Sequence, residues 1–260
     1  MLNLKDKDSI ITVVNSIEAT LKDNYRRKNN IDEFNNWLEW ANEIKFNRLS
    51  DNEYFIKLRN IVFYSGFKAS YVNRRMETLN KHFPHYCTVS KYGKDEIKKI
   101  LSDDDMIKNE RKINAVVSNA KEIQNIMREN ASFFDYLNKF EPEKSIDNLL
   151  SLKKDLQFRF DYLGEITVYH FLMDIGLDVL KPDRVITRIF TRLGLLKSEK
   201  EYWEAVKVGI EISKIVNKPI RTVDILFVQY GQILDGAESI CLKENPQCEI
   251  CKIKKYCDYK

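Results

Sequence analysis

The chain has 260 residues, of which 43% are hydrophobic, so it can form one large domain or two domains that share a core. No apolar run is long enough to cross a bilayer, and the polar start MLNLKDKDSIITVVNS is unlike a signal peptide, so we expect a cytoplasmic protein without a membrane partner. The net charge of +4 is compatible with a polyanionic partner but does not require one.

Apolar residues recur at helical spacing along most of the chain. In chain order, this periodicity is clearest in residues 9–21, 109–127, 201–216 and 222–234. Alternating strand patterns are scarce, and short stretches that contain proline mark helix ends. The sequence therefore predicts an all-α fold of roughly ten to twelve helices. Trp37 and Trp40 lie three residues apart and would share one helix face, either for packing or as a surface for another protein.

The last twenty residues, CLKENPQCEICKIKKYCDYK, contain four of the five cysteines, in the pattern C-x6-C-x2-C-x5-C. Thiols stay reduced in the cytoplasm, so this cluster indicates metal ligands rather than disulfides. Four thiolates suit a tetrahedral zinc ion or a cubane iron–sulfur cluster. A single C-x2-C between two longer arms favours four ligands around one bulky cluster, with a zinc-stabilised tail as the alternative. The predicted ligands are Cys241, Cys248, Cys251 and Cys257.

A second pattern precedes the cysteines. Asp183 begins the segment DRVITRIFTRLG, which follows the form D-x-x-[VI]-x-R-[VI]-x-x-R-L-G. Together with the cysteine spacing, this segment resembles the endonuclease III and adenine glycosylase branch of the helix–hairpin–helix DNA glycosylase superfamily. Residues 63–84 and 106–123 resemble helices of the family's six-helix barrel, and also those of the 3-methyladenine glycosylases, which lack the cluster. The resemblance covers roughly residues 50–260.

The resemblance implies a fold, a cofactor and a partner. It implies a six-helix barrel over residues 53–180 with a hairpin near residues 160–168. A helical domain that carries a [4Fe-4S] cluster is expected from both chain ends, residues 1–52 and 181–260. The partner would be double-stranded DNA with a damaged or modified base, bound by a monomer in the cytoplasm, associated with the nucleoid if the protein is bacterial.

Asp183 is the candidate catalytic residue. Pro182 suits the first turn of a helix, so the carboxylate would lie where backbone amides favour negative charge. Such a carboxylate can stabilise the sugar cation that develops as a nucleobase leaves, and can orient or deprotonate the attacking water. The base would first have to be flipped out of the duplex. A plain helix cap is the alternative interpretation of Asp183.

The hairpin departs from the family pattern. Where relatives have L-P-G-V-G, this chain has Phe160 to Gly164, followed by Glu165, whose charge would repel phosphate unless it points away. Ile166 occupies the position of the lysine that forms a Schiff base in bifunctional relatives. The sequence therefore predicts a monofunctional glycosylase that leaves an abasic site and lacks AP lyase activity.

The substrate is less sharply indicated. No acidic residue occurs from Tyr54 to Met76. In the resembling adenine glycosylases a glutamate in this region protonates the leaving purine, and the alkylated-purine glycosylases have a glutamate in a similar region. A base that leaves readily is therefore favoured: an alkylated purine, or a modified or deaminated pyrimidine chosen by pocket shape. Two alternatives stay open: a non-catalytic iron–sulfur DNA-binding protein on the same scaffold, and a glycosylase that acts on foreign modified DNA. The candidate DNA or base contacts are Tyr64, Phe67, Lys68, Tyr71, Gly164, Arg184 and Arg188.

Overall fold

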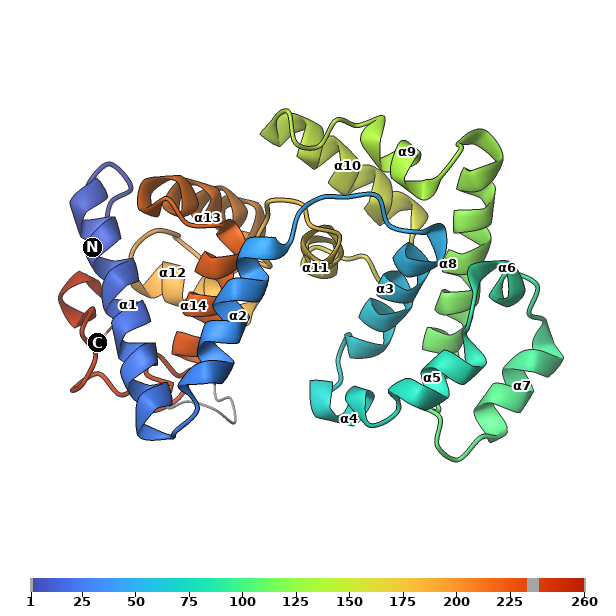
Figure 1. Cartoon of the computed structure of the whole chain (residues 1–260), viewed down its shortest axis with the longest axis horizontal. Coiled ribbons are helices and arrows are strands. Elements are labelled where there is room, and N and C mark those ends of the chain that lie inside the picture. The colour runs from blue at the N-terminus through green and yellow to red at the C-terminus, as the bar shows by residue number, and fades with distance from the viewer. Residues whose placement is uncertain (1, 233–238, 260) are drawn as a thin grey trace. The chain divides into compact units, whose positions relative to one another are not determined.

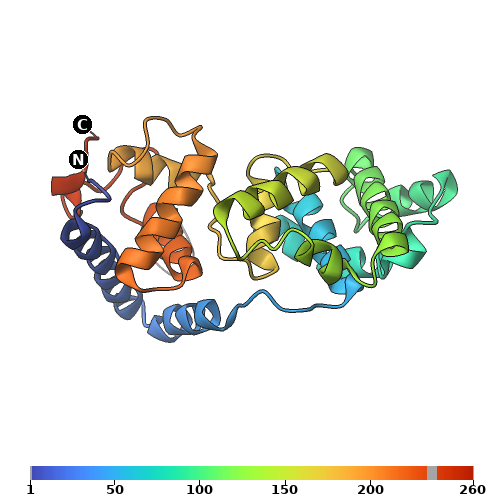
Figure 2. The same cartoon turned by 90° about the horizontal axis from the view of Figure 1, so that it is seen from above.

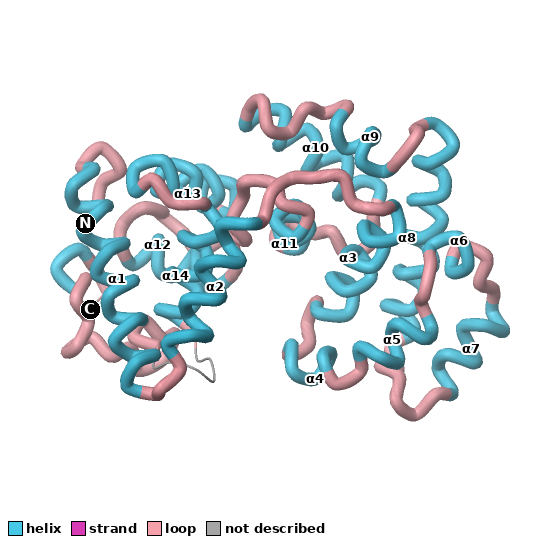
Figure 3. Tube along the Cα trace, viewed as in Figure 1, coloured by secondary structure: helices cyan, strands magenta, loops and turns pink. Residues whose placement is uncertain are grey.

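A computed structural model describes residues 2–232 and 239–259, and all regular structure in these two ranges is helical, as the periodicity predicts (Figure 3). The last two residues of the expected segment 222–234 lie outside them. None of the described helices is both long and apolar enough to cross a membrane.

The chain forms two compact units. The terminal unit consists of Met1–Lys45 and Asp178–Lys260, and the central unit of Phe46–Leu177. Both marked ends of the chain lie in the terminal unit (Figures 1 and 2). The helices of the terminal unit are α1 (Lys7–Arg27), α2 (Ile31–Glu43), α12 (Arg184–Arg192), α13 (Tyr202–Val216), α14 (Ile220–Gly231) and the 3-10 helix η1 (Lys254–Tyr256).

Helix α14 is the centre of the terminal unit. It packs against α1, α2, α12 and α13, and ten of its twelve residues are buried (Figure 1). Helix α1 contributes the apolar face that its spacing predicts, and each residue of that face is buried: Ile10, Val13, Val14, Ile17 and Leu21. Burial of these faces on a shared central helix joins the two chain ends into one core.

Two glycines let helices of the terminal unit approach closely. A Cβ on Gly209, in the middle of α13, would lie 2.0 Å from Cδ2 of Leu180. A Cβ on Gly231, at the end of α14, would lie 2.7 Å from Cγ1 of Val185 and 2.8 Å from Cδ1 of Ile189. Carbon atoms pack at about 3.5–4.0 Å, so only glycine fits at either position without movement of its neighbours. Close packing at these glycines therefore positions α12 and the segment that leads into it.

The central unit is built around α3 and α8. Helix α8 packs against α3, α6, α7 and α9, and buries the face that its spacing predicts, Ile113, Val116, Val117 and Ile123. The helices of this unit are α3 (Asp51–Tyr64), α4 (Ala69–Asn73), α5 (Met76–His82), α6 (Tyr86–Val89), α7 (Lys94–Ser102), α8 (Glu110–Glu129), α9 (Phe133–Asn138), α10 (Ile146–Arg159) and α11 (Thr167–Asp174).

Two buried cations bind helix ends in the central unit, Arg59 at the end of α5 and Lys112 at the end of α3. Arg59 donates hydrogen bonds to the carbonyl of Phe83 (3.1 Å) and to Oδ1 of Asn80 (2.8 Å). Lys112 donates to the carbonyl of Ser65 (2.6 Å), and burial lowers the pKa of its ammonium group to about 8. Each cation therefore satisfies carbonyl groups at a helix end that would otherwise lack donors.

Candidate functional site

Asp183 is the N-cap of α12. Its Oδ1 accepts hydrogen bonds from the backbone amides of Val185 (2.8 Å) and Ile186 (3.1 Å), and its carbonyl accepts one from Oγ1 of Thr187 (2.9 Å). The side chain is half-buried. The two amides hold the Asp183 carboxylate in one geometry at the start of the helix.

A second carboxyl group lies close to this helix start. The amide of Lys181, two residues before Asp183, donates to Oδ1 of Asp224 on α14 (3.1 Å). The pKa of Asp224 is raised to about 6, chiefly by burial and to a smaller degree by the Asp183 carboxylate, while Arg221 and the Lys181 amide oppose the shift. The apolar periodicity of the sequence did not identify Asp224 as a candidate site residue. The sequence feature that could have identified it is an acidic residue inside the apolar run TVDILFV.

The four tail cysteines converge. All of them are reduced and half-buried, and they line one small cavity of about 30 Å³: Cys241, Cys248, Cys251 and Cys257. Within residues 2–232 and 239–259, no three His, Cys, Asp or Glu side chains form a group that could hold a metal ion. The donor set itself, four thiols around one cavity, is that of a [4Fe-4S] cluster. The donor types therefore agree with the predicted cofactor, but the side chains are not arranged as a metal site here, and the cluster stays a prediction.

Two arginines of α12, one turn apart, reach the loop that begins with Cys241. Arg188 donates to the carbonyls of Gly231 (2.6 Å) and Cys241 (3.1 Å). Arg192 donates to Sγ of Cys241 (3.2 Å) and to the carbonyl of Leu242 (2.7 Å). Arg188 was predicted as a DNA or base contact, but it is only 6% exposed, and these bonds make it a support of the loop. Arg192 was not singled out from the sequence, although its spacing from Arg188 puts both on one helix face.

The turn between α10 and α11 is built differently from a glycine turn. Tyr162, with φ of +66°, takes the left-handed conformation, whereas Gly164 has room for a Cβ. The amide of Gly164 donates to Oγ1 of Thr167 (2.7 Å). Glu165 forms an ion pair with Lys153 (2.7 Å), which offsets the negative charge in the turn. The amide that would approach a DNA phosphate thus has an internal partner here.

The predicted aromatic contacts gather at the end of α3 and the start of α4. The hydroxyl of Tyr64 donates to Oδ1 of Asn73 (2.5 Å). The rings of Phe67 and Tyr71 stack with centroids 5.5 Å apart, and the ammonium group of Lys112 lies 5.3 Å from the Phe67 ring. All three aromatic side chains are partly exposed, so they form an accessible surface of the central unit.

The remaining predicted contacts are both exposed, Lys68 before α4 and Arg184 at the start of α12. The predicted site residues therefore divide between the two units. The central unit holds Tyr64, Phe67, Lys68, Tyr71 and Gly164. The terminal unit holds Asp183, Arg184, Arg188 and the four tail cysteines.

Comparison with solved structures shows the fold. The 8-oxoguanine glycosylase/lyase of Methanocaldococcus jannaschii, solved with DNA that contains 8-oxoguanine, is 17% identical, with a TM-score of 0.56 over 82% of this chain and 94% of that one. The 8-oxoguanine DNA glycosylase of Thermotoga maritima is 14% identical, with a TM-score of 0.51 over 84% and 95%. The 3-methyladenine DNA glycosylase I of Staphylococcus aureus is 20% identical over 54% and 84%, with a TM-score of 0.45. The fold is thus that of a helical DNA glycosylase.

The family model for methyladenine glycosylases matches residues 38–181, more than half of the chain. The chain therefore belongs to the methyladenine glycosylase family, within the DNA glycosylase superfamily that the sequence predicts. The match ends two residues before Asp183, so it covers the central unit but neither α12 nor the cysteine loop.

Proposed function

We propose that this protein is a monofunctional DNA N-glycosylase, which hydrolyses the bond between a damaged or modified base and its deoxyribose and leaves an abasic site. The observation that carries the proposal is Asp183, a carboxylate held by two backbone amides at the start of α12 in a chain of glycosylase fold. In this proposal the central unit supplies a helical barrel and the hairpin.

The proposed chemistry uses the two carboxylate oxygens differently. Oδ1 of Asp183 accepts both amide hydrogen bonds, and we assign the reaction to Oδ2. As the glycosidic bond breaks, its electron pair leaves with the base, and the carboxylate stabilises the sugar cation. A water molecule then bonds to the anomeric carbon, and its proton passes to Asp183. Ile166 has no amine that could attack the sugar, so this scheme contains no Schiff base and no strand cleavage.

The substrate that we propose is an alkylated purine. Helix α3 carries no acidic residue after Glu53, so a base that already bears a positive charge is favoured, because it needs no proton to leave. The family match to methyladenine glycosylases supports the same class of base. A modified or deaminated pyrimidine, or a modified base in foreign DNA, remains the alternative substrate.

We also propose a [4Fe-4S] cluster bound by the four tail cysteines. The bound cluster would crosslink the loop at four points, while Arg188 and Arg192 hold its backbone and its first sulfur. Anaerobically purified protein should be yellow-brown, with about four irons per chain. Cys251→Ala should lose this iron, whereas Cys87→Ser, a change outside the tail, should keep it. A colourless wild-type protein with one zinc would contradict the proposal.

A second function is favoured by the hairpin. Gly164 donates its amide internally and Glu165 lies in the same turn, and both features weaken a phosphate site. A non-catalytic DNA-binding protein on this scaffold would tolerate that weakness if other residues bind DNA. It would have no use for a carboxylate beside the sugar, so the Asp183 test below separates the two functions.

The test is single-turnover excision from duplexes that each contain one lesion, followed by hot alkali to reveal abasic sites. Asp183→Asn keeps the size and the hydrogen-bonding reach of the side chain but removes its charge, so excision should fall about 100-fold or more. Binding of the lesion duplex should survive. The matched control is Asp6→Asn, because Asp6 caps α1 in the same unit by accepting from the amide of Ser9. Normal excision by Asp183→Asn would show that Asp183 serves only as a helix cap and has no catalytic role.

A further inference from the structure

The segment of residues 178–183 presents the proposed catalytic carboxylate, although none of these residues belongs to a helix or strand. Asp183 is its last residue and the N-cap of α12. The side chains of Val179 and Leu180 are fully buried in the terminal unit. A catalytic group must be held in one geometry, and no helix or sheet ladder does this for the segment. The position of Asp183 therefore depends on the other groups that bind the segment.

One side chain of α14 binds the backbone of this segment. Asp224 is 7% exposed, and its Oδ1 accepts a hydrogen bond from the amide of Lys181 (3.1 Å). The amide of Asp183 in turn donates to the carbonyl of Lys181 (2.8 Å). The peptide groups on both sides of Lys181 are thus bonded, one to α14 and the other to the residue that is proposed to act on the sugar.

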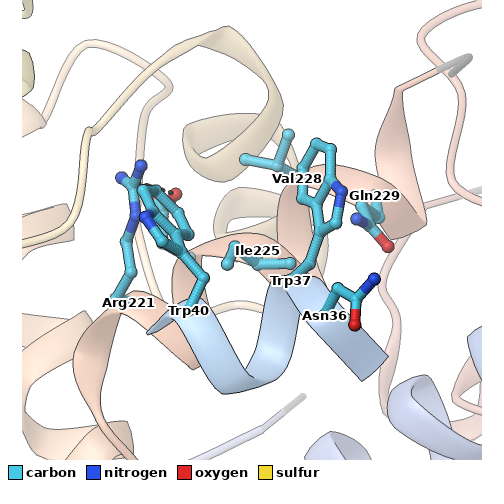
Figure 4. Close-up of a pocket in the computed structure, with 8 residues that line it drawn as sticks. Asn36, Trp37, Trp40, Arg221, Ile225, Val228 and Gln229 are labelled. Carbon is cyan, nitrogen blue, oxygen red and sulfur yellow. Dashed lines mark ion pairs between the residues drawn. The ribbon is translucent and has the colours of Figure 1, made fainter. Parts of the chain in front are cut away.

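The second carboxylate oxygen of Asp224 faces a cation. Oδ2 lies 3.8 Å from Nη1 of Arg221, one turn earlier in α14. The guanidinium group of Arg221 stacks on the ring of Trp40, 4.7 Å from its centroid, so α2 helps to hold it (Figure 4). All three side chains border a cavity of about 470 Å³ between α2 and α14. A continuous set of contacts therefore runs from α2 through Asp224 to the segment before Asp183.

A carboxyl group at this position is unfavourable for stability. Burial raises the pKa of Asp224, and the charge of Asp183 adds to this, while Arg221 and the Lys181 amide oppose the shift. A raised pKa means that the fold disfavours the charged form. An apolar side chain of similar size would avoid this penalty, but it could not accept the Lys181 amide. The hydrogen bond to the segment is therefore the feature of Asp224 that an apolar residue could not supply.

We propose that Asp224 is a positioning residue for the glycosylase reaction: it holds the Lys181 amide and thereby fixes the Asp183 carboxylate at the start of α12. The inference rests on the proposed glycosylase function for the role of Asp183. In this scheme Asp224 contacts neither the sugar nor the base, and acts only through the backbone of the segment. It should therefore affect the rate of bond breaking and leave the affinity for DNA unchanged.

The test compares two variants in single-turnover excision and in binding of the same lesion duplex. Asp224→Leu has a similar size but cannot accept a hydrogen bond, so excision should slow about 10- to 100-fold, with the Kd of the duplex within about twofold of wild type. Asp224→Asn keeps an acceptor oxygen and should restore excision to within about threefold of wild type. If Asp224→Leu does not fold, Asp224→Ala makes the same comparison, because it also lacks the acceptor.

Hydrogen exchange of the Lys181 amide, measured by NMR, needs no catalysis. The amide should be protected in the wild type and in Asp224→Asn, and should exchange about tenfold faster or more in Asp224→Leu. The matched control is Thr222→Val on the same helix. Thr222 is buried and its Oγ1 has no hydrogen-bond partner, so this change should alter neither excision nor exchange.

Three results would overturn the proposal: normal excision by Asp224→Leu, equally slow excision by Asp224→Asn and Asp224→Leu, or unchanged exchange of Lys181 in Asp224→Leu. Normal excision by every variant refutes the positioning role but keeps the glycosylase. A wild type that excises no base refutes the glycosylase, whereas faster exchange in Asp224→Leu alone would still show that Asp224 holds the segment.

Discussion

The contact between α13 and the segment before Asp183 can be tested by adding a single methyl group. In Gly209→Ala the new Cβ would lie 2.0 Å from Cδ2 and 2.7 Å from Cγ of Leu180. Leu180 is fully buried, so its side chain cannot turn into solvent. Overpacking of this kind costs about 1–3 kcal/mol, whereas alanine in a helix interior is about 1 kcal/mol better than glycine. We expect a net loss of up to about 2 kcal/mol.

Calorimetric unfolding at one scan rate measures this loss. Each kcal/mol should lower the midpoint by about 2–8 °C for a unit of this size. The control Gly93→Ala places a Cβ 3.5 Å from Oε2 of Glu96, which is an ordinary contact, and should shift the midpoint little. Excision should also slow, because Leu180 leads directly into Asp183 and small misplacements of a catalytic group are costly.

A double-mutant cycle makes the argument refutable. Leu180→Ala alone should cost about 2–5 kcal/mol, because it leaves a cavity in the core. In that background the clash is gone, so Gly209→Ala should now stabilise the protein by up to about 1 kcal/mol. The sign of the Gly209→Ala effect should therefore reverse. A variant that is more stable than the wild type while Leu180 is present would show that the two residues are not packed as described.

Three further predictions concern the site. Burial raises the pKa of Asp224 from 3.8 to about 6, so the protonated carboxyl group stabilises the fold at low pH and this stabilisation is lost as the pH rises through that interval. The unfolding midpoint of Asp224→Asn relative to wild type should therefore increase from pH 4 to pH 7. A difference that stays constant with pH would contradict the shift. Arg192→Gln removes charge-assisted hydrogen bonds to Cys241 and to the carbonyl of Leu242. In air, this variant should lose iron several times faster than the control Arg184→Gln, as measured by absorbance. Equal rates of iron loss would show that Arg192 does not stabilise the loop. With Ile166 in place of an amine, borohydride should trap no covalent DNA adduct on a denaturing gel, and an adduct would reveal another nucleophile.

Much of this protein could be predicted from local spacing alone. The apolar stripe of α1 and the all-helical fold follow from a period that each segment carries by itself, and both are confirmed. The motif that begins at Asp183 predicted the superfamily, which the family match confirms. The acidic cap was also readable from the sequence, because Asp183 is the N-cap of α12, whereas Pro182 precedes the cap and lies outside the first turn where it was expected.

Only the tertiary structure decided which distant residues meet. In the sequence, Asp224 and Gln229 are polar interruptions of an apolar helix. In the fold both line a cavity between α14 and α2, to which α2 contributes Trp37 from the other end of the chain. The hairpin shows the same limit on a smaller scale. The glycine of the sequence pattern suggested where the backbone turns, yet Tyr162 takes the left-handed conformation. Spacing along a chain determines which residues share a face, but contacts between faces depend on how whole helices pack, and no local period records that.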